Sequence, residues 1–149
     1  MKNITTYLIL VIFTLTGCSP LKSIKSEYNL IRTSAAAMSA NKVGNGKILI
    51  FNGSGINHKI DDTSRLNIWI NSNALGQINA NEYAVLLLLP GKYNFRLQHK
   101  DVANFESTHE VEITKETIFI NVKPTVTSNK VEIVKNMPEE LRWYNNVLK

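Results

Sequence analysis

The sequence predicts an all-β protein: an antiparallel, immunoglobulin-like sandwich of about seven strands followed by a short C-terminal helix. Three observations support this class. Between residues 47 and 134, short apolar segments alternate with a period of two, turn-forming residues separate them, and no convincing helical pattern lies between them. A parallel βαβ architecture needs such helices, so antiparallel pairing is favoured.

The expected strands cover residues 47–51, 65–71, 74–78, 83–89, 92–100, 108–113, 117–122 and 129–134. In the second of them, three aliphatic residues share one face, and Trp69 lies on the opposite face with two asparagines. Residues 83–89 are apolar on both faces, as in a central buried strand. Pro90-Gly91 is typical of a type II turn, and Pro124 marks the end of a strand because it cannot donate to a ladder.

The C-terminal segment, residues 137–149, has a different pattern. Glu139 and Glu140 lie in the first turn after Pro138, and Lys149 lies at the end, which suits the dipole of a helix. We therefore expect a short helix here, packed on the sandwich of residues 46–136.

The first 17 residues are typical of a secretory signal peptide. Lys2 is followed by an apolar stretch that is too short to span a membrane and that ends in small residues. The chain has 149 residues, a length that allows one ordinary domain. Because 44% of the residues are hydrophobic, a fully disordered chain is excluded. A single cysteine excludes an intramolecular disulfide.

Leu15-Thr16-Gly17-Cys18 resembles the lipobox of bacterial lipoproteins. The resemblance implies that the Cys18 thiol receives a diacylglyceryl group and that a peptidase cleaves between Gly17 and Cys18. It also implies that Ser19, rather than Asp, directs the protein to the outer membrane, on its periplasmic face. Residues 18–45 are then an acylated N-terminus and tether. The alternative is an ordinary signal peptide with a chance cysteine, or a cysteine buried in the core.

A second resemblance concerns the fold. Leu66–Asn71, then Ala74–Ile78, then Leu89-Pro90-Gly91-Lys92-Tyr93 are similar to segments of small lipoproteins with a carboxypeptidase-regulatory-like, or PEGA-like, β-sandwich. The resemblance covers about residues 47–122. It departs from the usual pattern at Asn71-Ser72-Asn73, where Asp-Gly is common. The resemblance implies a fold and a location rather than an activity.

The sequence gives no catalytic, metal or cofactor assignment. His58, His99 and His109 have no metal-ligand spacing, and a zinc ion bridging His99 and His109 is the metal alternative. Asp61-Asp62 lacks the spacing of a calcium loop, and Gly53-Ser54-Gly55 lacks the features of a phosphate loop or a nucleophile elbow.

Three aromatic residues are candidate partner contacts: Trp69, Trp143 and Tyr144. The favoured alternative for Trp69 is burial beneath the terminal helix. The function expected is that of a non-enzymatic envelope lipoprotein that contacts the membrane through Cys18 and binds an envelope protein, peptidoglycan or another glycan. Nucleic acid is not expected, because basic residues form no stripe with interleaved aromatics. The alternatives are an accessory subunit of a secretion or surface assembly, and a periplasmic hydrolase or metal enzyme.

Overall fold

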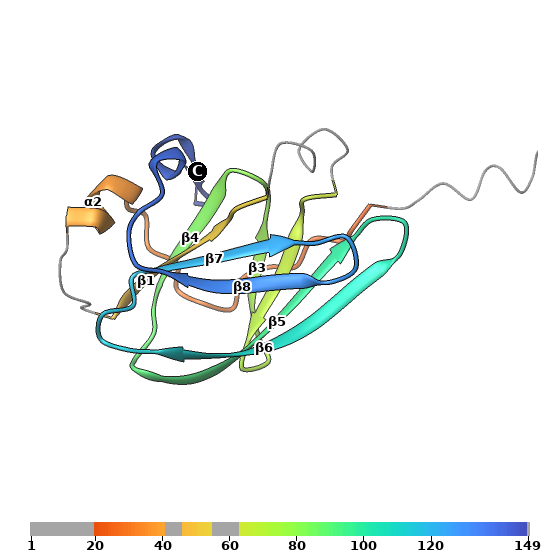
Figure 1. Ribbon diagram of the computed structural model, residues 1–149, viewed down its shortest axis with the longest axis horizontal. Helices are drawn as coiled ribbons and strands as arrows, with labels where there is room; N and C mark the ends of the chain where they lie inside the picture. The colour runs from red at the N-terminus through yellow and green to blue at the C-terminus, as the bar shows by residue number, and fades with distance from the viewer. Residues whose placement is uncertain (1–19, 41–45, 55–62, 149) are drawn as a thin grey trace, which may run out of the picture.

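The computed structural model describes residues 20–40, 46–54 and 63–148, which form nine strands in two sheets (Figure 1). Within these residues, one α-helix and one 3-10 turn accompany the strands. The elements are α2 (Ala35–Ala40), β1 (Lys47–Asn52), β2 (Leu66–Ile70), β3 (Asn73–Ile78), β4 (Glu82–Leu87), β5 (Gly91–Lys100), β6 (Asn104–Ile113), β7 (Phe119–Pro124), β8 (Asn129–Val134), η1 (Glu139–Trp143) and β9 (Asn145–Asn146). All eight expected strands are confirmed, with ends that shift by a few residues.

The two sheets differ in how their strands pair. The four-stranded sheet has the order β3-β2-β5-β6 and is antiparallel throughout. The five-stranded sheet has the order β8-β7-β1-β4-β9, and within it β1 pairs with β7, and β4 with β9, in parallel. The prediction of antiparallel pairing is therefore correct for most but not all neighbours. β1 and β7 can pair in parallel without a crossover helix because the long connection between them consists of the four-stranded sheet and β4.

The turn between β2 and β3 fits its sequence. Asn71 and Ser72 are the two residues between the strands, and their φ angles are 49° and 74°. Positive φ at both central residues is what a type I′ hairpin turn requires, and asparagine tolerates it better than most residues.

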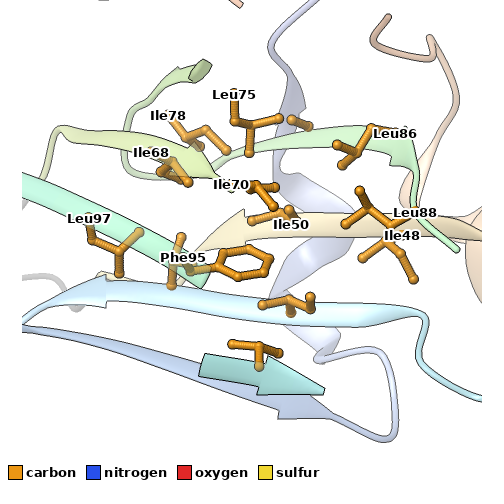
Figure 2. Close-up of a cluster of buried hydrophobic side chains, with 14 of the residues drawn as sticks. Ile48, Ile50, Ile68, Ile70, Leu75, Ile78, Leu86, Leu88, Phe95 and Leu97 are labelled. Atoms are coloured by element: carbon orange, nitrogen blue, oxygen red, sulfur yellow. The ribbon is translucent and has the colours of Figure 1, made fainter. Parts of the chain in front are cut away.

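The main core lies between the two sheets, where apolar side chains from both inner faces interdigitate (Figure 2). Ile68 and Phe95 come from the four-stranded sheet, whereas Ile48, Ile50 and Leu86 come from the five-stranded sheet, and all five are at most 1% exposed. Burial of each such side chain contributes about 1.5–3 kcal/mol to folding, so this layer is the principal source of stability.

A second apolar cluster lies on the outer face of the five-stranded sheet. Leu49 and Phe51 alternate with Ile48 and Ile50 on β1, so they point away from the main core. Met38 of α2 and Leu141 of η1 cover them. The five-stranded sheet is therefore buried on both faces, which explains why the sequence of β4 is apolar in both phases.

The N-terminal segment, residues 22–33, lies along the open side of the sandwich. The Glu27 N–H donates to Ala74 O of β3 at 2.8 Å, and the Ile31 N–H donates to Val85 O of β4 at 2.7 Å. Tyr28 and Leu30 pack against the main core. The described part of the stretch assigned above to a tether is thus in contact with both sheets.

The C-terminal segment differs from the helix expected over residues 137–149. After η1, Tyr144 adopts an extended conformation, with φ −80° and ψ 150°. The Asn145 N–H then donates to Asn81 O, and the Val147 N–H donates to Tyr83 O. Pairing with the edge of β4 satisfies these backbone groups, so the chain continues as β9 rather than as a helix.

Candidate functional site

The residues singled out from the sequence do not form one site. Gly17 and Cys18 lie outside the described residues. Trp69 is on the outer face of the four-stranded sheet, whereas Trp143 and Tyr144 lie over the outer face of the five-stranded sheet. These aromatic residues therefore define two separate surfaces.

Trp69 is paired with a cation from the neighbouring strand. The Arg96 guanidinium carbon lies 4.0 Å from the centroid of the Trp69 ring, and an Arg96 nitrogen lies 3.5 Å from a Glu106 carboxylate oxygen. β2 and β5 place Trp69 directly opposite Arg96 in the register. The favoured prediction that the terminal helix covers Trp69 is wrong, because the C-terminal segment packs on the other sheet.

Trp143 is the most exposed aromatic side chain of the described residues, at 83%. Its neighbours in the sequence are fixed: Leu141 is fully buried, and the Tyr144 ring packs edge-on against Phe51 with centroids 6.1 Å apart. Burial raises the pKa of the Tyr144 phenol above its ordinary value. The turn therefore holds an exposed indole on a rigid support.

A buried polar network joins the two sheets near one end of the sandwich. His99 Nδ1 lies 2.7 Å from Asn129 Oδ1, and the His99 ring stacks on Phe105 with centroids 5.0 Å apart. The Asn129 side-chain amide donates to Ser107 Oγ at 3.1 Å, and Ser107 Oγ lies 2.9 Å from His109 Nε2. These contacts satisfy polar groups that burial would otherwise penalise.

The register does not pair the two histidines that were considered for a bridging zinc. His109 lies opposite Phe95, and His99 lies opposite Phe105. Within residues 20–40, 46–54 and 63–148, no group of three or more histidine, cysteine or acidic side chains is arranged to hold a metal ion.

The remaining motifs from the sequence either take part in structural hydrogen bonds or lie outside the described residues. Ser54 is buried, and its hydroxyl donates to the Asn52 side chain. Asn52 in turn donates to Ser64 O at 2.6 Å and to Ile78 O at 3.0 Å. His58, Gly55 and Asp61-Asp62 lie outside the described residues.

A groove that the sequence analysis did not anticipate lies where the N-terminal segment meets the four-stranded sheet. It has a volume of about 450 Å³, and its lining includes Pro20, Lys22, Gln98, Lys100 and Asn104. A row of side-chain amides forms beside it. Gln77 donates to Asn67 Oδ1 at 3.0 Å, and the Asn67 amide donates to Lys22 O at 2.9 Å.

The amide row had a partial signal in the sequence, because Asn67 and Gln98 both fall on the polar phase of their strands. The contact with Lys22 had none, because residues 20–27 carry no periodic pattern. Asn67 is buried within this row, between Gln77, Gln98 and Lys22. The row therefore fixes the beginning of the described chain to the surface of β2.

Comparisons of the chain with protein-family models, with curated proteins and with solved structures found no match. Among the described residues, none of the helices has the length and apolar character needed to cross a membrane.

Proposed function

We propose that this chain is an outer-membrane lipoprotein whose two-sheet domain is a non-catalytic binding module on the periplasmic face. A diacylglyceryl group on Cys18 anchors it, and the signal peptide of residues 1–17 is removed. The support for the anchor is the lipobox-like sequence that ends at Cys18. Each buried methylene contributes about 0.8 kcal/mol, so several acyl chains on one residue make a stable anchor.

We further propose that the sandwich is of the immunoglobulin-like or PEGA-like type. Two facing sheets with a shared apolar core support this assignment. A fold of this type does not define a function by itself, so the binding role is argued from particular surface residues.

The single observation that carries the binding role is the exposed indole of Trp143 on a fixed turn. Tryptophan is enriched among the residues that dominate protein interfaces. Because Leu141 and Tyr144 already hold the turn in place, little conformational entropy is lost when a partner covers Trp143. The proposed partner is another protein of the envelope, and the module then serves as an accessory subunit of an envelope assembly.

Two variants test the two parts of this proposal. Cys18→Ser is expected to abolish incorporation of labelled palmitate and to leave the precursor uncleaved; continued labelling would refute the anchor. Trp143→Ala is expected to lower recovery of one stoichiometric envelope partner by about tenfold or more. Trp69→Ala is the matched control, because Trp69 lies on the other sheet. Equal recovery with both variants would refute the contact.

A hydrolase is the second candidate, and one distance favours it. The 2.9 Å between Ser107 Oγ and His109 Nε2 is within the range of a nucleophile and its general base. Ser107 Oγ also accepts a hydrogen bond from Asn129, which gives the same pair a structural role. A fluorophosphonate probe separates the two: labelling of the wild type that Ser107→Ala abolishes would favour the hydrolase.

A further inference from the structure

We propose that one end of the sandwich, formed by the tips of the β5–β6 and β7–β8 hairpins, rests on a lipid surface that contains anionic headgroups. The hairpin-tip end is defined by residues 101–103 and 125–128. The proposal rests on the lipid anchor proposed at Cys18, and it adds which surface of the domain meets the membrane.

The path of the chain places the anchor at this end. Pro20 and Lys22 line the same groove as Lys100 and Asn104, which flank the β5–β6 tip. Cys18 precedes Pro20 by two residues. Two residues of extended chain span at most about 7 Å, so an anchor two residues before Pro20 has only this reach. An acyl group on Cys18 therefore brings the bilayer close to the β5–β6 tip.

The β7–β8 tip belongs to the same end. Asn129, the first residue of β8, is hydrogen bonded to His99, the penultimate residue of β5. The two hairpins accordingly end side by side, where the N-terminal part of the described chain also lies (Figure 1). Both tips can meet one flat surface at the same time.

Each tip carries an exposed valine. Val102 is 90% exposed and Val126 is 78% exposed. Turns favour glycine, proline, asparagine, aspartate and serine, and a β-branched apolar residue at a tip gains nothing from contact with water. Insertion of both valines to the level of the headgroups removes this apolar surface from water.

Charge at the tips fits an anionic surface. Within two residues of the tips lie Lys100, Lys123 and Lys130, and the acidic residue there is Asp101. Lys123 of β7 and Lys130 of β8 both form ion pairs with Glu132 of β8, and Lys22 adds a cation in the groove. With Glu132 included, four lysines face two acidic residues at this end, so a positive excess of two remains. Lysine side chains can extend their ammonium groups to lipid phosphates while their methylene chains lie on apolar surface.

Exposed apolar residues also occur at the other end of β5, and they supply a matched control. Leu89 is 77% exposed, nearly the same as Val126. Leu89 lies just before Gly91, where β5 begins, whereas Val102 lies just after Lys100, where β5 ends. Ten residues of strand separate the two ends by about 30 Å. Leu89 therefore cannot reach the bilayer while the tips rest on it.

The test uses the full-length protein as cells produce it, with p-benzoylphenylalanine at position 102, 126 or 89. Each variant is reconstituted in vesicles of phosphatidylethanolamine and phosphatidylglycerol, irradiated and analysed for lipid adducts. Adducts at positions 102 and 126, with none at 89, are the expected result. Adducts at 89, or none at either tip, would overturn the proposal.

Two further arms separate this proposal from its premise. Replacement of phosphatidylglycerol with phosphatidylcholine is expected to lower tip adducts on the order of fivefold; an equal yield would overturn the anionic preference. If mass spectrometry shows that cells leave Cys18 unacylated, the anchor fails. The chain's single thiol is then coupled to a maleimide phospholipid. Tip adducts in the coupled protein would support membrane contact by the hairpin-tip end independently of the acyl anchor, and their absence would overturn that contact.

Discussion

His99 on β5 and Asn129 on β8 connect the two sheets through a buried contact of 2.7 Å between Nδ1 and Oδ1. Asn129 also donates to Leu97 O at 3.2 Å, so one asparagine ties the first residue of β8 to the backbone and side chains of the opposite sheet. This residue therefore links the two sheets close to the two hairpin tips.

We predict that Asn129→Ala lowers the free energy of unfolding by about 1–3 kcal/mol, because it leaves buried polar groups of His99 and Leu97 without this partner. Chemical denaturation measures the change. Asn136→Ala is the control, since Asn136 is exposed and its replacement is expected to change stability by less than about 0.5 kcal/mol. Equal midpoints for the two variants would show that the contact is energetically unimportant.

Two residues of the turn η1 are predicted to differ in their effect on stability. Leu141→Ala is expected to cost about 2–5 kcal/mol, because it leaves a cavity in the cluster that covers the five-stranded sheet. Trp143→Ala, two residues away, is expected to change the free energy of unfolding by less than about 0.5 kcal/mol. Thermal and urea unfolding of both variants check this. Strong destabilisation by Trp143→Ala would mean that the indole serves the fold rather than a partner.

Alkaline pH is predicted to release the N-terminal segment. Tyr28 donates to Ile70 O, and Tyr83 donates to Thr33 O, each at 2.8 Å. Burial raises the pKa of both phenols above their ordinary value near 10. Because the pKa of each phenol is higher in the folded state than in the unfolded state, the two neutral tyrosines contribute to stability. This stabilisation is complete below about pH 10 and is lost as pH rises through the folded-state pKa.

Hydrogen exchange at the Ile31 amide, measured as pH rises above about 10 and corrected for the intrinsic rate, follows this release. A double Tyr28→Phe/Tyr83→Phe variant is the control, because it cannot ionise at these positions. An identical pH dependence in the variant and the wild type would assign the release to other groups.

A close approach at Gly53 gives a fourth prediction. A Cβ atom at this position would lie 2.2 Å from Asn121 Oδ1, which accepts a hydrogen bond from the Gly53 N–H at 3.1 Å. Gly53→Ala therefore displaces the end of the Asn121 side chain, while the Gly53 N–H keeps its hydrogen bond to Val122 O at 3.0 Å, and we expect a loss of about 1 kcal/mol. The same substitution in an Asn121→Ala background is expected to change stability by less than about 0.5 kcal/mol. Equal costs in both backgrounds would exclude this clash as the cause.

The strands were predictable because each combines a period-two pattern with turn residues at its ends. Ile68 and Trp69 illustrate this, since their alternation alone assigned them to opposite faces. The C-terminal helix was not predicted correctly, because Glu139–Trp143 has helical propensity while the edge of β4 offers backbone partners to the residues that follow. Pairing with β4 determined that these residues form a strand, and the local sequence pattern does not predict such tertiary pairing.

The candidate surfaces were predictable only in part. Trp69 was assigned to an outer face, but its coverage by Arg96 depends on a register between strands that are far apart in the sequence. The contacts of residues 22–33 depend on a few apolar residues such as Tyr28, Leu30 and Ile31, and so short a stretch does not show which strands it lies against. The groove beside Lys22 follows from those contacts and was therefore not foreseen.

Intact-mass and N-terminal peptide measurements on the protein purified from cell membranes decide whether Cys18 is the lipid anchor. We expect a chain that starts at Cys18, has lost residues 1–17 and carries the mass of a diacylglyceryl group, commonly with a further acyl chain on the new amine. A chain that retains the peptide bond between Gly17 and Cys18, with an unmodified thiol and no membrane association, would contradict it.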